Sequence, residues 1–179
     1  MTTGPDADFT ALVQRQSRFV FQVSYAVLLN SHDAEDAVQE TFLKLYRNRG
    51  WQNVENERAF LARVAWRVAV DLRPRASRHS ISLSDTEEAE EAPSSRPGPE
   101  ESFLSANQHA TVHRMIDALA EELRVPLVLS AFEQLSSREI GVILGIPQGT
   151  VRTRLQRARQ MLRQKLSATG PRSVEVWNA

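Results

Sequence analysis

A stretch rich in serine, proline and glutamate divides this chain into two parts and limits each of them to a small domain. Residues 77–103 contain Pro93, Pro97 and Pro99 and show no sustained apolar period. A segment of this composition cannot bury enough apolar surface to fold, so it predicts a flexible, acidic linker. Each remaining part has fewer than about 80 residues, which is sufficient for one small helical domain.

On both sides of this linker, apolar residues recur at the spacing of an α-helix, and no convincing strand pattern is present. The predicted fold class is therefore all-α. We expect one helical domain at residues 1–76, a second at 104–168 and a short tail at 169–179. No apolar run approaches the roughly 18 residues of a membrane span, and the first residues lack the pattern of a secretory signal, so a cytoplasmic location is expected.

Three helices are expected in the N-terminal domain. The first has an apolar face from Phe9 to Val27 and should end near Asn30, and the second begins where Ser31 or Asp33 can cap it. The third runs roughly from residue 57 to 72, is stopped with the help of Pro74, and points these side chains inward: Phe60, Leu61, Val64, Val68 and Leu72.

The C-terminal domain should contain helices near 104–120, 121–132, 137–144 and 150–166. Pro126 is expected early in the second of these helices, where the missing backbone N–H of proline destabilises the helix least.

The last two of these helices have the connection of a helix-turn-helix. Ser136 and Glu139 fit a capping box, in which each side chain satisfies a backbone donor at the start of the first helix. In the turn that follows, Gly145 stands where that helix must end and Pro147 where the next can begin. This compact turn is typical of helix-turn-helix units.

The final helix is expected to have two distinct faces. Its apolar stripe consists of Val151, Leu155, Ala158, Leu162 and Leu166. Beside it, on a wheel of about 100° per residue, runs a row of long donors: Arg152, Gln156, Arg159 and Arg163. Arg and Gln in the N-terminal half of the helix can read base edges in a major groove. Phosphate contacts suit Thr150, Thr153, Arg154 and Arg157. A solvated basic face is the alternative, but the capping box, the tight turn and the Gly-Thr-Val opening together favour DNA binding.

The segment from Asp33 to Tyr46 predicts a protein-binding helix. Its inward stripe is Ala34, Val38, Phe42 and Leu45, and the opposite face carries Asp36, Gln39, Glu40, Leu43 and Tyr46. Large apolar groups ringed by polar ones are typical of a protein-binding patch. The alternative is that another helix of the same domain covers Leu43 and Tyr46.

Aromatic residues alternate with arginines in and before the third expected helix. Trp51, Phe60 and Trp66 stand among Arg49, Arg58, Arg63, Arg67 and Arg73. This mixture suits single-stranded DNA, whose bases stack on rings while its backbone meets cations. Core packing is the alternative for each aromatic residue.

Composition narrows the remaining function classes. The formal net charge is +0, yet two basic segments, at 63–78 and 152–165, are separated by an acidic one, so a local nucleic-acid surface remains possible. Zero cysteines remove thiolate metal sites and cysteine nucleophiles, and the four histidines are scattered. We therefore expect no enzyme activity, no metal and no cofactor.

These segments together resemble the sigma-70 superfamily of RNA polymerase sigma factors, in its two-domain extracytoplasmic-function group. Residues 33–46 look like region 2.2, which in the family docks on the polymerase clamp, and 135–159 look like region 4.2, which reads the −35 element. The resemblance implies that the outward face of 33–46 touches core polymerase and that these residues touch the −35 duplex: Arg152, Thr153, Gln156 and Arg157.

The residues from Trp51 to Arg67 resemble regions 2.3 and 2.4, which capture the melted −10 element. We expect Trp51, Arg58, Arg63 and Arg67 to contact it. The sequence departs from the family here, since the family often has Trp where this chain has Phe60 and Asn where it has Arg67. The resemblance also implies promoter DNA and an anti-sigma factor as partners.

The main rival is a transcription regulator of the LuxR type, which has a similar helix-turn-helix. Its receiver domain would require strands alternating with helices in the first half of the chain, and that pattern is missing.

Overall fold

The structure is a computed structural model that describes residues 5–52, 54–73, 110–131 and 134–169. Over these ranges the chain forms helices joined by short turns and contains no strand, so the all-α prediction is confirmed. The expected linker at 77–103, Pro74 and the part of the tail after residue 169 lie outside the described residues.

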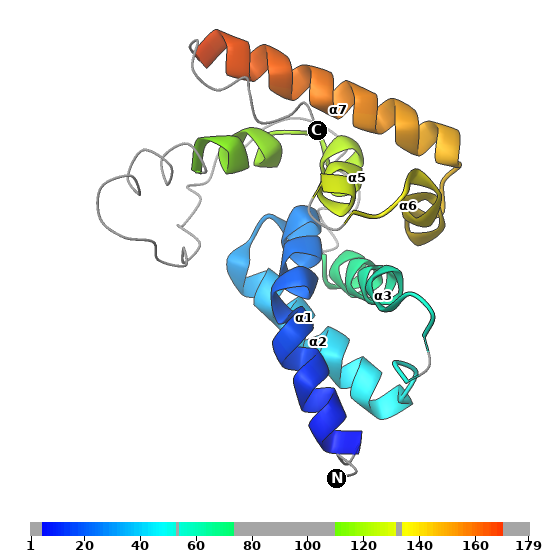
Figure 1. Cartoon of the computed structure of the whole chain (residues 1–179). Helices are drawn as coiled ribbons and strands as arrows, with labels where there is room; N and C mark the ends of the chain where they lie inside the picture. The colour runs from blue at the N-terminus through cyan, green and yellow to red at the C-terminus, as the bar shows by residue number, and fades with distance from the viewer. Residues whose placement is uncertain (1–4, 53, 74–109, 132–133, 170–179) are drawn as a thin grey trace.

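Three helices form the N-terminal part, and each packs on the other two (Figure 1): α1 (Pro5–Leu28), α2 (Ser31–Asn48) and α3 (Glu57–Leu72). Three alanines of α3, Ala62, Ala65 and Ala69, are completely buried, so the helix can approach its neighbours closely. The prediction that Leu72 points inward is wrong, because 44% of it is exposed. Leu72 lies in the last turn of α3, beyond the buried stripe.

Asparagines cap two of these helices. The side chain of Asn30 accepts from the backbone N–H of Asp33 at 3.0 Å, and Asn56 accepts from Ala59 at 3.0 Å. The prediction that Ser31 or Asp33 caps α2 is therefore wrong. Asn30 is extended, with φ −133°, whereas Ser31 is already helical, so Asn30 occupies the position from which a side chain can reach the free N–H groups.

The C-terminal part contains a helix that is described from residue 110 to 117, then α5 (Glu121–Ala131), α6 (Ser137–Leu144) and α7 (Gln148–Thr169). Pro126 lies in the second turn of α5, later than expected, and is fully buried in the core. Val151, Leu155, Ala158 and Leu162 of α7 are buried, which confirms most of the predicted stripe, and Leu166 is half-buried.

The two parts of the chain pack against each other. Helix α1 lies against α5, and α3 lies against α6, while α7 crosses above them in Figure 1. Arg124 of α5 lies in this contact, only 5% exposed, and its Nε donates to the Ala26 carbonyl of α1 at 2.8 Å. Among the helices that the structure describes, none covers the outward face of α2 or the donor face of α7.

Candidate functional site

The outward face of α2 is exposed as the sequence predicts. Asp36 and Gln39 are exposed and Glu40 is half-buried. Leu43 is 47% exposed and Tyr46 is 49% exposed, so no other helix of the described chain covers these two large side chains. Water contact with apolar side chains of this size is unfavourable, and a binding partner can remove it.

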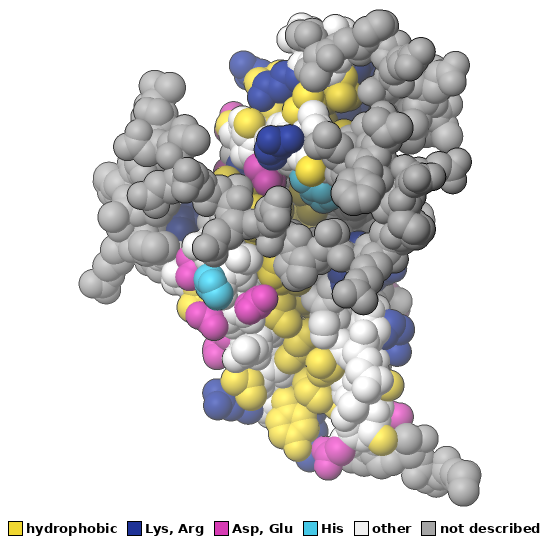
Figure 2. All heavy atoms as spheres, turned by 90° about the vertical axis from the view of Figure 1, so that its left-hand side faces the viewer, with side chains coloured by type: hydrophobic (Ala, Val, Ile, Leu, Met, Phe, Trp, Pro, Cys, Tyr) yellow, Lys and Arg dark blue, Asp and Glu magenta, His cyan; other side chains and the backbone are white. Residues whose placement is uncertain are grey.

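A shallow, mainly apolar groove of about 380 Å³ runs beside this face, between α1 and α2. Leu43 and Tyr46 form one wall, and Phe9 and Val13 of α1 contribute to the other. Figure 2 shows hydrophobic side chains gathered along the lower part of the molecule, with acidic and basic groups at the border. The outward face of α2, which the sequence identifies, is therefore continued by side chains of α1. These side chains join it only because the two helices pack side by side.

Trp51 packs against Phe9, one of the aromatic residues that line this groove. Its ring lies 5.4 Å from that of Phe9, centroid to centroid, and Phe9 also contacts Tyr46 at 5.2 Å and Phe42 at 6.3 Å. The Tyr46 hydroxyl donates to Asp6 at 3.3 Å. Trp51 is therefore half-buried, and part of its ring surface is already in contact with another side chain.

The three arginines expected at the −10 element are all exposed on α3, but they differ in their contacts. Arg67 projects from the helix, while Arg63 donates from Nη2 to the backbone carbonyl of Val142 on α6 at 3.2 Å. Phe60 and Trp66 are half-buried against the core. The structure therefore places Trp51 with α1 and α2, and places Arg58, Arg63 and Arg67 on α3.

Helix α6 is defined by its ends. The Ser136 backbone N–H donates to Glu139 at 2.8 Å, and the Glu139 N–H donates to the Ser136 hydroxyl oxygen at 3.3 Å, so the predicted capping box is confirmed. The Ser136 hydroxyl also donates to the Glu139 carboxylate at 2.7 Å, and this hydrogen bond, together with the one from the Ser136 N–H, lowers the pKa of Glu139 below its ordinary value. Gly145 ends the helix in the left-handed region, with φ 68°, as the sequence predicts.

Gly141 fixes how α6 meets the turn. A Cβ on this residue would lie 2.7 Å from the carbonyl oxygen of Ile146, and that oxygen belongs to the backbone and cannot rotate away. The Ile146 N–H also donates to the Gly141 carbonyl at 3.0 Å. Only glycine allows this close contact between α6 and the turn that leads into α7.

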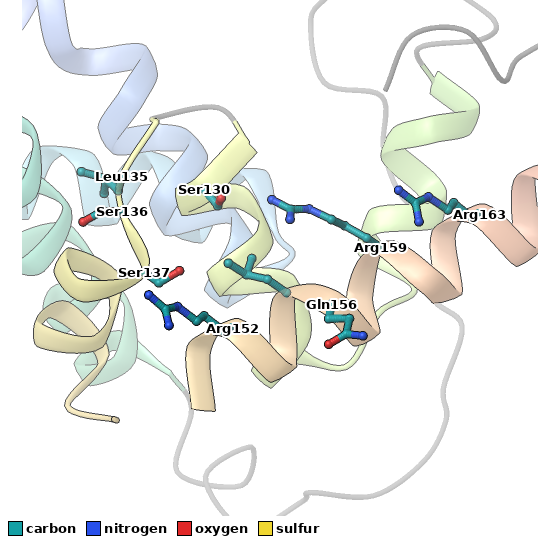
Figure 3. A pocket seen from close by; sticks show the side chains of 9 residues that line it. Ser130, Leu135, Ser136, Ser137, Arg152, Gln156, Arg159 and Arg163 are labelled. Atoms are coloured by element: carbon teal, nitrogen blue, oxygen red, sulfur yellow. The ribbon is translucent and has the colours of Figure 1, made fainter. Parts of the chain in front are cut away.

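The predicted donor row of α7 borders a polar cleft of about 500 Å³ (Figure 3). Its arginines and glutamine come from α7, and the opposite side is formed by three serines from α5, α6 and the residue before α6. Figure 3 shows Arg159 extending toward Ser130, and Arg152 beside Ser137 at the start of α6. The residues lining it include Arg152, Gln156, Arg159, Arg163, Ser130, Ser136 and Ser137.

Sequence reasoning missed the three serines of this cleft and left Arg163 out of the predicted contact set. Ser136 and Ser137 are signalled by the helix start at α6, where free N–H groups favour anions. Ser130 has no such signal, because only the packing of α5 on α7 brings it there.

The four residues of α7 that are expected to contact phosphates differ in their exposure and in their contacts within the protein. Arg157 is exposed, and Thr150 is half-buried. The Thr153 hydroxyl donates to the Gly149 carbonyl at 3.1 Å, while Arg154 lies 3.7 Å from Glu122 of α5. Arg154 must therefore separate from Glu122 before it can contact a phosphate. Helix α7 itself contains no acidic residue.

Neither a metal nor a membrane span is suggested by the helices. In the part of the chain that the structure describes, no group of three histidine, cysteine, aspartate or glutamate side chains could hold a metal ion. None of the described helices combines the length and the apolar character needed to cross a membrane.

In comparisons with known proteins, both parts of the chain match models of the same protein family. Residues 12–79 match the family model for sigma-70 region 2, and residues 109–162 match the model for sigma-70 region 4. The chain is 31% identical over 172 residues to the ECF RNA polymerase sigma factor SigW of Bacillus subtilis, with 91% of each protein covered. It is 33% identical to the RNA polymerase sigma-H factor of Pseudomonas aeruginosa, covering 91% of this chain and 88% of that protein.

A third relative is longer. The chain is 33% identical over 156 residues to the ECF RNA polymerase sigma factor SigE of Mycolicibacterium smegmatis, which covers 87% of this chain but only 60% of SigE. Two solved structures have the same fold. One is CnrH in complex with the cytosolic domain of CnrY, with a TM-score of 0.62 and 23% identity over 93% of this chain and 92% of that one. The other is the sigma factor RpoE in complex with the anti-sigma factor NepR from Bartonella quintana, with a TM-score of 0.67 and 18% identity over 91% and 99%.

Proposed function

Because the chain belongs to the sigma-70 family, as an RNA polymerase sigma factor of the extracytoplasmic-function group, we propose how its parts divide the work of promoter recognition. Residues 1–76 bind core polymerase and the melted −10 element. Residues 104–168 bind the −35 duplex, and the linker at 77–103 connects the two. The chain would act in the cytoplasm, where polymerase and promoter meet.

Core polymerase binds the outward face of α2. The observation that carries this assignment is the exposure of Leu43 and Tyr46, on a helix whose opposite face is buried. Asp36, Gln39 and Glu40 surround them with polar groups, and the groove beside them offers an apolar surface to a partner side chain. An apolar centre with a polar rim is the usual anatomy of a protein interface.

The −35 duplex binds α7. Arg152, Gln156 and Arg159 point their donors to one side of the helix and can pair with guanine or adenine edges. Thr150, Thr153, Arg154 and Arg157 contact phosphates and orient the helix in the groove. The serines at the start of α6 lie on the same side as Arg152, which favours a backbone contact there.

The melted −10 element meets α3. Arg67 and Arg58 are exposed on this helix, and their positive charges attract a phosphate backbone. Arg63 and Trp51 also contact the DNA after Arg63 has released the Val142 carbonyl and Trp51 has separated from Phe9.

Regulation by an anti-sigma factor is the final part of this proposal. The two solved relatives are complexes with the cytosolic domain of CnrY and with the anti-sigma factor NepR. The exposed apolar groove between α1 and α2 is a surface that such a protein could cover in competition with polymerase.

The alternatives have less support. A LuxR-type regulator would need an α/β receiver domain, whereas the described residues of the first half are helical. Sigma factors are transcription initiation factors without enzyme activity, and we propose none for this chain.

Run-off transcription tests the proposal directly. Purified bacterial core polymerase is incubated with a genomic promoter library, with and without this chain, and the transcripts are sequenced. New transcripts with a shared −35 and −10 pattern, appearing only with the chain, are the expected result. A transcript set that does not change, with an active core enzyme, would reject the assignment.

A further inference from the structure

Helix α7 carries a glutamine within the row of arginines that borders the polar cleft. Gln156 lies one turn after Arg152 and one turn before Arg159, and all three side chains line the cleft (Figure 3). An arginine side chain offers only donors, whereas the amide of a glutamine has donors on its nitrogen and an acceptor on its oxygen. Gln156 is therefore the position in this row that can donate and accept at once.

The major groove of DNA presents a matching difference between bases. Guanine shows two acceptors, N7 and O6, which suit the paired donors of an arginine. Adenine shows an acceptor at N7 beside a donor at N6, and a glutamine amide can satisfy both. The chemistry of Gln156 therefore favours adenine, and that of Arg152 favours guanine.

The side chain of Gln156 is available for such a contact. Leu155 and Ala158 are 5% and 0% exposed and fix this turn of α7 on the core, while Gln156 is exposed. Among the residues that the structure describes, none forms a hydrogen bond with the Gln156 amide. This differs from Thr153 and Arg154, whose polar groups already have partners within the protein.

Gln156 also lies in the half of α7 that can enter a groove. The helix has 22 residues and begins at Gln148, so Gln156 is about 12 Å from its start at 1.5 Å per residue. Recognition helices place their N-terminal residues on base edges in the major groove. Gln148 is the other glutamine in that half but does not border the cleft, and Gln160 and Gln164 lie in the second half.

The spacing of Arg152 and Gln156 limits the distance between the bases that they can read. The two residues are four positions apart, which is about 6 Å along the helix axis. Because successive base pairs are about 3.4 Å apart, this rise corresponds to about two base-pair steps. The guanine and the adenine should therefore be neighbours or be separated by a single base pair.

We propose that Gln156 is a specificity-determining residue of this sigma factor, and that its amide reads an adenine of the −35 element within about two base pairs of a guanine read by Arg152. The inference deepens the proposed function and rests on it, since α7 must bind the −35 duplex. A bidentate pair should favour adenine over the other bases at this position about 5- to 150-fold. The arginines of α7 add affinity that does not depend on this base, because they attract the DNA backbone by charge.

Selection from a randomised duplex tests this proposal with the full chain. A library of promoter fragments, randomised through the −35 element, is bound by core polymerase with the sigma factor, and the retained DNA is sequenced. The wild-type protein should enrich an adenine beside or near a guanine. Gln156→Ala should lose the preference for adenine at that one position. It should keep the preference for guanine, because Arg152 is unchanged, and this preference shows that α7 is still folded and bound.

Gln156→Glu tests the chemistry of the contact more closely. A carboxylate accepts from the N4 amino group of cytosine but cannot donate to adenine N7, so the preferred base should change from adenine to cytosine. Gln160→Glu is the matched control, since it makes the same change one turn farther along α7, at an exposed position outside the cleft. Both variants add the same negative charge, so a general weakening of DNA binding should appear in both, and the change of base in Gln156→Glu alone.

The inference is overturned by a wild-type −35 pattern without this adenine and guanine, or by a preference for adenine that persists in Gln156→Ala. A uniform loss of affinity with an unchanged pattern also overturns it, because the Gln156 amide would then contact the DNA backbone. The same change of base in Gln160→Glu would do so as well. If the wild-type protein binds polymerase but enriches no −35 sequence at all, the proposed role of α7 is refuted and this inference with it.

Discussion

Helices α2 and α7 share a plan and differ in the chemistry of their exposed faces. Each buries one apolar stripe and leaves the other side to solvent. On α2 the exposed side combines acids with two large apolar side chains beside an apolar groove, whereas α7 has no acid and borders a polar cleft with arginines and glutamine. The two helices are alike in fold, but their exposed faces suit different kinds of partner.

The difference also predicts how each contact responds to solution conditions. Binding through apolar side chains depends on the surface removed from water, and added salt screens it little. Binding through arginines to DNA releases counterions and weakens steeply as salt increases. Polymerase binding by α2 and promoter binding by α7 should therefore separate in a salt titration.

The largest effect should come from the apolar pair on α2. The Leu43→Ala, Tyr46→Ala double variant should weaken binding to core polymerase by about 2 to 4 kcal/mol, because these side chains have the character of an interface hot spot. Titration with fluorescently labelled core enzyme measures it. Leu72→Ala is the matched control, an equally exposed leucine on α3, and a similar loss there would break the distinction between α2 and the rest of the surface.

Arg152 tests whether the face of α7 reads sequence or only charge. Arg152→Ala should cost about 1 to 3 kcal/mol of discrimination between the −35 element and scrambled duplex, if the side chain holds a base edge. Promoter binding by the holoenzyme provides the measurement, with Gln160→Ala of the same helix as control. An equal loss of affinity for both duplexes would indicate that Arg152 contacts phosphates, and that α7 binds DNA through charge without reading its sequence.

Gly141 tests whether α7 depends on the position set by α6. Gly141→Ala should lower the free energy of unfolding by about 1 to 3 kcal/mol, because the added Cβ meets the fixed Ile146 carbonyl. Urea denaturation followed by circular dichroism measures the loss. Gly149→Ala is the control, since a Cβ there meets nothing within 4 Å. Equal stability of the two variants would show that the turn adjusts.

The smallest effect should be at the capping box. Ser136→Ala should cost about 1 kcal/mol at neutral pH. The lowered pKa of Glu139 adds a pH dependence: its contribution is complete above the ordinary value of 4.5 and disappears as the pH falls through the lowered folded value. The difference in stability between the wild-type and Ser136→Ala proteins should therefore decrease in acid, and a constant difference down to the acid transition would contradict this origin.

Local features of the chain were predictable from sequence, since neighbouring residues determine them. The capping box of Ser136 and Glu139, the turn at Gly145 and the apolar stripe of α7 each depend on a few adjacent positions. The exposed face of α2 was predictable for the same reason, because helical periodicity separates its two sides.

Features that depend on packing between distant segments were not predictable. Nothing near Trp51 indicates that it packs against Phe9, and nothing near Arg63 indicates that the Val142 carbonyl accepts its hydrogen bond. The burial of Arg124 is the clearest case, since a lone arginine in an apolar segment suggests exposure until α1 is placed beside it. These contacts join residues about 40 to 100 positions apart, beyond the reach of any periodic pattern.

The hydrogen bond from Arg124 to Ala26 also has a consequence for synthesis. Ala26 leaves the ribosome 98 residues before Arg124, an interval of about 5 to 20 s at roughly 5 to 20 residues per second. During that time the nascent chain can form α1 and α2 with the α1 terminus still hydrated. Each newly translated molecule therefore passes through a stage in which the exposed face of α2 exists and its own C-terminal helices do not, which gives a partner of that face a brief opportunity to bind first.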